Sequence, residues 1–320
     1  MPRAFITGIT GQDGSYLAEF LLEKGYEVHG LVRPSRNLET SWLTPLLQNR
    51  RLVLHNGDLT DAKSLTRILS EATPEELYHL AGQSHVGASF DLVESTCETA
   101  GMGALHIMEM ARNLSSRPRL FHASSSEVFG RPEIIPQDEQ TPFRPVTPYG
   151  CAKAFATQLA SVFRQNFGLF VSNGILYNHE SPRRGDAFVT KKICLAAAAI
   201  KEGRQKELML GSLTAQRDWG DARDYVQGMW LALQHEKPED FLFATGKLHT
   251  VGDVVECAFK AVDLDWQDYV KQDPRFMRAN EPARLVGNTA KAQRLLNWQP
   301  TTPFSQLITE MTQAALGQQK

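Results

Sequence analysis

The sequence has no long hydrophobic run, and this absence argues against a membrane-spanning helix. Its longest apolar candidate, Cys194–Ile200, has seven residues and is mostly alanine, whereas a helix that crosses a bilayer needs about 20. The first residues are typical of a core strand rather than of a charged leader followed by an apolar segment, so we expect no signal peptide. We therefore expect no association with a membrane.

An excess of charge of one sign is also lacking. The 320 residues include 34 basic and 36 acidic ones, which gives a formal net charge of −2. This balance provides no general electrostatic attraction to nucleic acid, so we expect no nucleic-acid partner. A chain of this length can still bury a substantial core, as one large domain or two small ones.

Cysteine is scarce and widely spaced. The four cysteines are Cys97, Cys151, Cys194 and Cys257. No two of them have the spacing of paired metal ligands, so we expect no metal site. The pattern is typical of buried free thiols in a reducing compartment, and the expected location is therefore cytoplasmic.

Strand and helix patterns alternate through the first half of the chain. The expected strands are Arg3–Thr7, Tyr26–Val32, Leu52–Asn56, Leu77–Ala81, Arg119–Ala123 and Leu169–Ile175, and the expected helices lie near Tyr16–Leu22, Ala62–Ser70, Gly103–Ala111 and Pro148–Phe167. Such alternation predicts an α/β fold, a Rossmann-like doubly wound parallel sheet with helices on both faces.

The alternation breaks after about Asn178, where a basic stretch precedes a helix pattern near Val189–Ile200. We interpret residues 1–177 as a dinucleotide-binding domain, to which 217–243 returns. Residues 178–216 and 244–320 are then expected to form a smaller mixed α/β lobe that binds the substrate. Ligands of doubly wound sheets bind beyond the carboxyl ends of the strands, where Gly8, Arg33, Asp58, Gly82 and Ser124 are expected.

A glycine-rich run, Phe5–Gly14, follows the first strand directly and opens the first helix. Glycines at 8, 11 and 14 permit a tight turn and a close approach of the backbone to a pyrophosphate, which binds the free N–H groups of the helix N-terminus. A plain strand-to-helix turn is the alternative. The position directly between a strand and a helix favours dinucleotide binding.

The end of the second strand carries Arg33 and no acidic residue that could accept a hydrogen bond from a ribose 2′-hydroxyl. An arginine there can pair with a 2′-phosphate instead. Arg33 and Arg36 therefore favour NADP over NAD, although exposed arginines are often only solvated. Asp58, after the third strand, is placed for the adenine edge.

A tyrosine and a lysine, Tyr149 and Lys153, share one face of a predicted helix. Thr147 is suited to the N-cap and Pro148 to the first helical position. An ammonium beside a phenol, near the positive end of a helix, is expected to lower the pKa of the phenol and make it a general base. The alternative is that this spacing occurs by chance, as it does on many amphipathic helices.

Hydroxyl and carboxylate groups follow the fifth strand, in the run Ser124-Ser125-Ser126-Glu127. At the carboxyl end of a strand they are well placed for proton transfer to a sugar hydroxyl. A polar loop with a solvated glutamate is the alternative.

These motifs together resemble the extended short-chain dehydrogenase/reductase family. Further segments narrow the resemblance to its GDP-mannose 4,6-dehydratase branch and extend it over nearly the whole chain: Gln83–Val86, Asn178–Gly185, Phe188–Lys192, Arg217–Gly220, Gly287–Ala292 and Trp298–Pro300.

The resemblance implies an internal redox cycle on a GDP-sugar. Tyr149, supported by Lys153 and Ser125, would take the proton of the sugar 4-hydroxyl while hydride passes from C4 to NADP⁺. Glu127 would remove the C5 proton, which the C4 ketone makes acidic, and the C6 hydroxyl would leave as water with help from Ser125 or Glu127. Return of the hydride to C6 would give GDP-4-keto-6-deoxymannose.

The resemblance also assigns binding residues. The expected cofactor-binding residues, besides Tyr149 and Lys153, are Gly8, Thr10, Gly11, Gln12, Asp13, Gly14, Arg33, Arg36, Asp58, Leu59, Leu80, Ala81, Gln83, His179 and Arg184. The expected substrate-binding residues, besides Ser125, are Ser84, Asn178, Val189, Lys192, Arg217, Arg278 and Glu281.

Several positions depart from the family pattern, and several functions stay open. Pro34 replaces the second arginine of a family loop, Ala100 stands where relatives carry Asn or Asp, and Ala279-Asn280 replaces Pro-Ala. The alternatives are a dehydratase of another GDP-sugar such as a GDP-heptose, a GDP-4-keto-6-deoxymannose reductase, a 4-epimerase, and a catalytically silent NADP-binding regulator.

The resemblance further implies a homodimer or homotetramer. The dimer would form through Ser95–Ala111 and Tyr149–Phe167, packed as a four-helix bundle. The two helices carry more apolar residues than packing on one face of the sheet requires, including Met108, Met110, Leu159 and Phe163.

Overall fold

Seven parallel strands form the central sheet in the part of the chain that the structure, a computed structural model, describes (residues 1–39, 41–276 and 284–317). Their order is β3-β2-β1-β4-β5-β6-β11. The strands are β1 Arg3–Thr7, β2 Glu27–Val32, β3 Leu52–Asn56, β4 Glu76–His79, β5 Arg119–Ser125, β6 Val171–Leu176 and β11 Asp240–Phe243. The predicted doubly wound sheet is confirmed, with small shifts at the strand ends.

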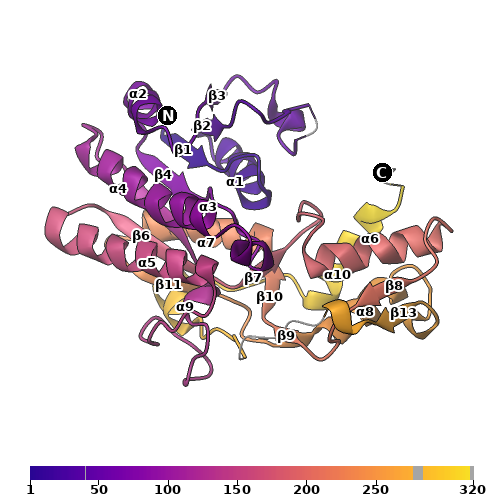
Figure 1. The fold of residues 1–320 in the computed structure, drawn as a ribbon. Helices are drawn as coiled ribbons and strands as arrows, with labels where there is room; N and C mark the ends of the chain where they lie inside the picture. Colours follow the sequence, from indigo (N-terminus) through magenta and orange to yellow (C-terminus); the bar gives the residue numbers. More distant parts are fainter. Residues whose placement is uncertain (40, 277–283, 318–320) are drawn as a thin grey trace.

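Helices cover both faces of this sheet (Figure 1). Helices α1 (Gln12–Glu23) and α7 (Ala222–Gln234) pack together on one face, and α2 (Ala62–Ala72), α4 (Gly103–Asn113) and α5 (Pro148–Phe167) lie on the other. Neighbouring strand residues enter the two cores in alternation, since Ile6 belongs to the α1/α7 core and Phe5 to the α2/α4/α5 core. Burial on both faces explains the nearly continuous apolar strands that mark a parallel sheet in the sequence.

The helix expected at Ser95–Ala111 is longer and irregular. Helix α3 (Val93–Cys97) runs into a π-helical turn, Glu98–Met102, and then into α4. Met108 and Phe163 are buried beneath these helices, and Met110 and Leu159 are partly buried there, so their interpretation as surplus apolar residues was wrong. The exposed apolar side chains of this region are instead Phe90, Leu92, Val93, Met102, Phe155, Val162 and Phe167.

The remaining elements form a smaller lobe beside the sheet (Figure 1). Three two-stranded ladders join β7 (Asn178–Glu180) to β10 (Trp219–Asp221), β8 (Leu208–Leu210) to β13 (Val270–Gln272), and β9 (Gln216–Arg217) to β12 (His249–Thr250). Helices α6 (Val189–Lys201), α8 (Val251–Lys260) and α10 (Phe304–Ala315) enclose a separate core. Short 3-10 helices lie at Thr44–Leu46, Gly87–Phe90, Ser126–Val128, Trp266–Asp268 and Pro274–Phe276.

A late segment of the chain packs back on the sheet. Helix α9 (Ala290–Leu296) and Trp298 join the core that α7 covers. The Trp298 indole donates a hydrogen bond of 2.8 Å to the carbonyl oxygen of Asp224 in α7. This segment belongs to the stretch that the sequence assigned to the lobe; the division into domains itself stays a prediction.

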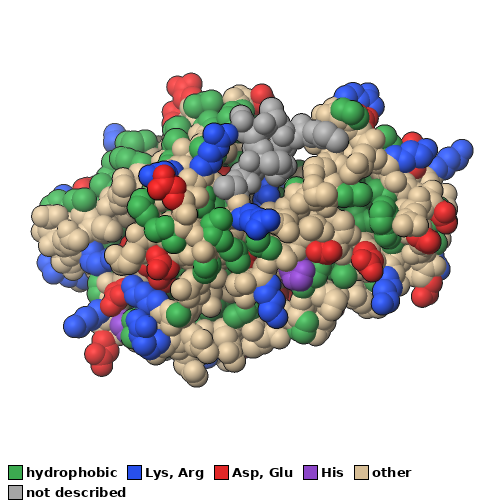
Figure 2. Space-filling view, turned by 90° about the horizontal axis from the view of Figure 1, so that it is seen from below, with side chains coloured by type: hydrophobic (Ala, Val, Ile, Leu, Met, Phe, Trp, Pro, Cys, Tyr) green, Lys and Arg blue, Asp and Glu red, His purple; other side chains and the backbone are tan. Residues whose placement is uncertain are grey.

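The cysteines are free, but they are not all buried. Cys194 is buried and Cys257 partly so, whereas Cys97 and Cys151 are exposed, so the expectation of buried thiols was wrong for the last two. Within the described residues, no helix is long and apolar enough to cross a membrane. On the face drawn in Figure 2, basic and acidic side chains are interspersed.

Candidate active site

The glycine-rich loop between β1 and α1 has the shape that a bound pyrophosphate requires. Gly8 has φ +76°, a conformation that residues with a side chain rarely adopt, and a Cβ on Gly14 would lie 2.2 Å from the carbonyl oxygen of Gly8. Gly11 is the N-cap of α1 and brings no side chain to the first N–H groups of the helix. These groups are therefore available to an anion.

The residues expected to hold a cofactor follow the carboxyl ends of four neighbouring strands. Gly8–Gly14 follow β1, Arg33 and Arg36 follow β2, Asp58 and Leu59 follow β3, and Leu80, Ala81 and Gln83 follow β4. The strand order reverses between β1 and β4, the switch point at which doubly wound sheets bind ligands. Topology thus brings together residues that lie far apart in the sequence.

Arg33 and Arg36 are both exposed at this edge. Asp58 accepts hydrogen bonds from the backbone and side chain of Thr60. These bonds, with the charge of Arg33, hold the pKa of the Asp58 carboxyl below its usual value. The Asp58 carboxylate and the Arg33 guanidinium are thus close enough to interact electrostatically, where the adenosine end of a dinucleotide would lie.

Two residues of the glycine-rich loop tie it to β7. The Asp13 carboxylate lies 2.8 Å from Nε2 of His179, whose ring stacks on Tyr225 at 4.5 Å. Burial acts to raise the pKa of Asp13 and to lower that of His179, but their mutual charge and hydrogen bond outweigh burial in both. The Gln12 amide donates a hydrogen bond to the carbonyl oxygen of His179 and accepts one from the hydroxyl of Ser181. The structure thus brings Gln12, Asp13 and His179 together, with hydrogen bonds that join Gln12 and Asp13 to His179.

Arg183 strengthens the same connection, and the sequence analysis did not single it out. Its guanidinium lies 3.8 Å from the ring centroid of Tyr16 and 2.6 Å from the Glu19 carboxylate, both on α1. It also donates to the hydroxyl of Ser15. The neighbouring Arg184 turns the other way, onto the Phe188 ring and the buried Glu180 carboxylate. The sequence signal that could have pointed to Arg183 is the pair of basic residues shortly after β7.

Helix α5 begins as its sequence predicts. The Thr147 hydroxyl accepts the N–H of Gly150 at 2.9 Å and Pro148 occupies the first turn. The Lys153 ammonium reaches back to the carbonyl oxygen of Ala123 at 2.7 Å, and the hydroxyls of Ser124 and Thr157 are 2.6 Å apart. These contacts hold the start of α5 against the end of β5.

Tyr149, Ser125 and Glu127 meet at this junction. Tyr149 is buried and hydrogen-bonded to Ser125, and the charge of Glu127 reaches its phenol. Ser125 in turn accepts the N–H of Glu127 at 3.3 Å, which fixes the short turn that carries the carboxylate. A phenol, a hydroxyl and a carboxylate are thus collected beside the glycine-rich loop.

The expected lowering of the Tyr149 pKa is wrong for the protein without a ligand. Burial raises the pKa of the phenol to about 12, against the opposing hydrogen bond from Ser125. Burial also lowers the pKa of Lys153 to about 8. The ammonium lies 5.8 Å from the Tyr149 ring centroid. The spacing of the two residues is visible in the sequence, but the desolvation that opposes their charged forms is not.

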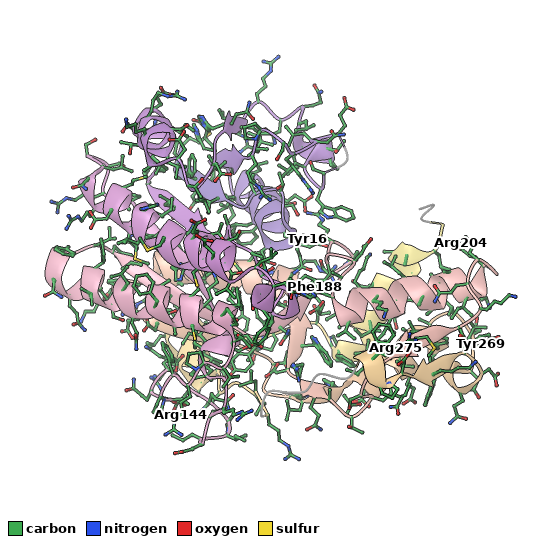
Figure 3. All side chains as sticks on the ribbon, in the orientation of Figure 1. Tyr16, Arg144, Phe188, Arg204, Tyr269 and Arg275 are labelled. Atoms are coloured by element: carbon green, nitrogen blue, oxygen red, sulfur yellow. The ribbon has the colours of Figure 1, made fainter. Side chains whose placement is uncertain are left out.

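The expected substrate residues come from both parts of the molecule. Ser84 follows β4, Asn178 lies in β7, Val189 and Lys192 lie in α6, and Arg217 lies in β9. The Lys192 ammonium donates to the carbonyl oxygen of Met209 at 3.2 Å and lies 4.7 Å from the Phe276 ring centroid. Phe188, labelled in Figure 3 where α6 meets the sheet layer, packs at 5.4 Å against the His85 ring. Arg278 and Glu281 lie outside the described residues.

A buried carboxylate beside Arg217 was also missed. Asp218 accepts hydrogen bonds from the backbone and hydroxyl of Thr245 and from the N–H groups of Gly246 and Gly287. Burial raises the pKa of this carboxyl. It anchors the loop after β11 and thereby supports the strand that carries Arg217. Within the described ranges, no group of three or more His, Cys, Asp or Glu side chains could hold a metal ion.

Comparison with known proteins identifies relatives whose sequences match nearly the whole chain. A family model described as GDP-mannose 4,6 dehydratase matches residues 5–311. The chain is 47% identical to GDP-mannose 4,6 dehydratase 1 of Arabidopsis thaliana, over 96% of this chain and 88% of the relative. It is 45% identical to the Homo sapiens GDP-mannose 4,6 dehydratase, over 97% and 90%, and 42% identical to that of Yersinia enterocolitica, over 100% and 95%.

Solved structures share the fold at lower sequence identity. DesIV, a dTDP-glucose 4,6-dehydratase from Streptomyces venezuelae solved with NAD bound, superposes with a TM-score of 0.86 at 23% identity, over 98% of this chain and 96% of that one. RMD from Pseudomonas aeruginosa, solved with NADPH, gives a TM-score of 0.81 at 22% identity, over 99% and 100%.

Replacing Gly14 by alanine should disrupt the loop between β1 and α1. The new Cβ would overlap the carbonyl oxygen of Gly8, and such overpacking lowers the free energy of unfolding by about 1–3 kcal/mol. Binding of a dinucleotide should be lost as well, because the loop must shift. Urea unfolding and titration calorimetry measure the two effects.

Gly103→Ala is the matched control, since Gly103 is also helical and buried but a Cβ there meets only ordinary contacts at 3.5 Å and beyond. It should leave binding unchanged and raise the free energy of unfolding by up to about 1 kcal/mol. Equal behaviour of the two variants would contradict a special role for Gly14.

Proposed function

The chain belongs to the GDP-mannose 4,6-dehydratase family, and we propose that the junction of β5 and α5 is the active site at which it converts GDP-mannose to GDP-4-keto-6-deoxymannose and water. The family activity is that of a hydro-lyase acting on a nucleotide sugar. The observation that carries the proposal is the meeting of Tyr149, Ser125, Glu127 and Lys153 beside a loop shaped for a dinucleotide.

NADP fits this loop and the strand ends beside it. The free N–H groups at the start of α1 suit the pyrophosphate, and the exposed guanidinium groups of Arg33 and Arg36 suit a 2′-phosphate. When bound, NADP supplies the acceptor for the hydride from C4 and the donor of the hydride to C6. The choice of NADP over NAD rests on the two arginines.

Tyr149 is the base for the sugar 4-hydroxyl in this proposal. Its Oη takes the hydroxyl proton as C4 becomes a ketone. Since burial holds the pKa of the phenol at about 12, the phenolate depends on stabilisation by the Ser125 hydrogen bond and by a positive charge nearby. Lys153 carries the nearest ammonium on the same helix face, and its own pKa of about 8 lets it release a proton close to neutrality.

Glu127 performs the elimination. The C4 ketone acidifies the C5 proton, the carboxylate removes that proton, and the C6 hydroxyl leaves as water after it receives a proton from Glu127. Ser125 holds the turn that presents this carboxylate. As C6 gains the hydride, C5 takes up one proton from water, and the product keeps its ketone at C4.

Residues of both parts of the molecule would hold the nucleotide sugar. The cations of Lys192 and Arg217 suit the diphosphate, and both come from the lobe. Ser84, Asn178 and Val189 lie on the segments that follow β4, form β7 and open α6. Their positions support a sugar site between the lobe and the junction of β5 and α5.

The protein is proposed to form a homodimer through the exposed apolar residues of α3, of the π-helical turn that follows it, and of α5. Val93, Met102, Phe155 and Val162 are 43–49% exposed. A Cβ on Gly101, in the π-helical turn, would lie 3.5 Å from the Phe155 ring, so this turn and α5 present one continuous surface. An apolar surface of this kind, repeated on a second copy, is suited to a four-helix interface.

Glu127→Gln should stop the reaction after C4 is oxidised, since the amide cannot accept the C5 proton. Loss of a general base typically costs about 10²–10⁴-fold in rate. Tyr149→Phe should instead stop the reaction before any oxidation, with cofactor affinity preserved. Absorbance of the reduced nicotinamide distinguishes the two variants, because it should accumulate only in Glu127→Gln.

Product analysis with the wild-type protein tests the activity itself. In deuterated water, mass and NMR spectra should show deuterium at C5 and the original C4 hydrogen at C6 of the keto sugar. A reductase, or a dehydratase of another GDP-sugar, would leave GDP-mannose unconverted.

Arg33→Ala should weaken NADP⁺ binding about 10- to 100-fold, as expected for the loss of a charge-assisted hydrogen bond, and leave NAD⁺ binding nearly unchanged. Calorimetric titration with the two dinucleotides measures this difference. Arg50→Ala is the control, because Arg50 is exposed but precedes β3 and therefore lies near the amino ends of the strands, away from the cofactor loop. Equal losses for NADP⁺ and NAD⁺ would argue against the 2′-phosphate contact.

Phe155→Asp should convert the proposed dimer into monomers, because it places a charge in the middle of the α3/α5 surface. Light scattering at micromolar concentration measures the molar mass. Leu295→Asp is the control, since Leu295 is 37% exposed but lies on α9. A wild-type protein that is already monomeric at this concentration would refute the interface.

A further inference from the structure

A row of polar side chains crosses the core between the sheet and helices α4 and α5. Parallel register pairs Thr7 with His79, His79 with His122, His122 with Asn173, and Asn173 with Asp240, on strands β1, β4, β5, β6 and β11. The first four members of the row, Thr7 to Asn173, are at most 1% exposed. Side chains in equivalent register point to the same face, so the row is continuous through an otherwise apolar layer.

Both ends of this row are hydrogen-bonded. At one end, the Thr7 hydroxyl lies 2.8 Å from Nδ1 of His79, and the His79 and His122 rings stack at 5.7 Å. At the other end, the Asn173 amide donates to Asp240 at 2.7 Å, and Asp240 pairs with Arg164 at 2.5 Å. The Asp240 and Arg164 side chains are 24% and 20% exposed, so the row reaches solvent there.

The middle of the row holds polar atoms without partners. Among the described residues, Nε2 of His79, both ring nitrogens of His122 and Oδ1 of Asn173 are buried and make no hydrogen bond. Buried polar atoms are normally satisfied, and a cluster of several is a typical site for an internal water. These three neighbouring side chains therefore point to a bound water between the imidazoles and Asn173.

A second imidazole pair in the same sheet shows the contrast. His29 and His55 stack at 5.1 Å on β2 and β3, but His29 is hydrogen-bonded through both nitrogens, to His55 at 2.9 Å and to Glu27 at 2.8 Å. Hydrogen bonds therefore explain why His29 is tolerated there. In the His79–His122 pair, by contrast, three of the four ring nitrogens make no hydrogen bond to a described residue.

The charge of Lys153 reaches both rings of the His79–His122 pair. Its ammonium is held at the carbonyl oxygen of Ala123, the residue after His122. Burial and, next, the positive charge of Lys153 hold the pKa of both imidazoles below the usual value, to about 3 for His79. The rings are therefore neutral, and a neutral imidazole can accept a proton at one nitrogen while it releases one from the other.

The proposed reaction needs a route by which one proton leaves Tyr149. Tyr149 gains the 4-hydroxyl proton in each turnover, yet the product keeps its ketone, so this proton cannot return to the oxygen from which it came. Tyr149 must release it before the next cycle. The Glu127 proton leaves with the water, and C5 takes up one proton from the solvent, so release of the Tyr149 proton to the solvent completes the balance.

We propose that His79 and His122, with a bound water, relay this proton from the Tyr149–Lys153 pair through the core toward the Asp240 edge of the sheet. Lys153 gives up one proton to the water and takes the Tyr149 proton in return; each imidazole accepts a proton at one nitrogen as it releases one from the other and so stays neutral; one proton leaves the far side of the row, and no electrons move. The two histidines touch neither sugar nor cofactor and act through Lys153, so they are positioning residues. The inference rests on the proposed function.

His122→Leu tests the relay, because leucine fills similar space without ring nitrogens. We expect kcat for GDP-mannose to fall on the order of 10-fold, less than the 10²–10⁴-fold of losing the base itself, with KM and NADP⁺ affinity unchanged. The solvent deuterium isotope effect on kcat should increase, since proton transfer becomes rate-limiting. A role in packing alone would shift the unfolding temperature and leave this isotope effect unchanged.

Two further variants complete the experiment. His55→Leu, in the contrasting pair, should retain the wild-type kcat and isotope effect. His79→Gln, which keeps a polar group beside Thr7, should reproduce the His122→Leu effect even if His122→Leu does not fold. Wild-type isotope effects in folded His122→Leu or His79→Gln would overturn the relay alone, whereas a wild-type protein that forms no keto sugar would overturn the proposed function first.

Discussion

The candidate site depends on how the start of α5 is held against the end of β5. Two side-chain contacts, Lys153 to the carbonyl oxygen of Ala123 and Ser124 to Thr157, fix the helix along the strand. Gly150 allows the approach, because a Cβ there would lie 2.6 Å from the carbonyl oxygen of Glu127. A shift of α5 by one turn would separate the phenol from the hydroxyl and carboxylate that follow β5. The relative positions of these groups are therefore a property of helix docking rather than of a loop.

The glycine-rich loop adds a second constraint, since it is bonded to the strand that begins the lobe. The contacts of Asp13 with His179 and of Arg183 with Glu19 cross from the sheet domain to the segment that leads into α6. The loop that would bind the cofactor and the helix that would bind the sugar are consequently connected within a few residues. Movement of the lobe would therefore displace the N-terminus of α1 through these contacts.

The sequence predicted best what local signals determine. Both ends of α5 follow from Thr147, Pro148 and the left-handed Gly168, and the loop at Gly8–Gly14 follows from its glycines. Three features were not predictable in this way: the raised pKa of Tyr149, the ion pair of Arg183 with Glu19, and the return of α9 to the sheet. Each depends on burial or on a partner more than 70 residues away. The histidine row was missed for the same reason: only strand register places His79 beside His122. The roles of the site residues and the assembly stay predictions.

The seventh strand of the sheet, β11, is encoded after the first part of the lobe, about 64 residues beyond the end of β6. During synthesis the first six strands are complete once Leu176 has emerged, but β6 then presents an unpaired edge, and the α1 face lacks α7. An open edge of this kind is prone to pair with other chains. The nascent chain therefore carries an open sheet edge and an uncovered face while the ribosome delivers residues 177–243, and expression at reduced temperature should improve its yield.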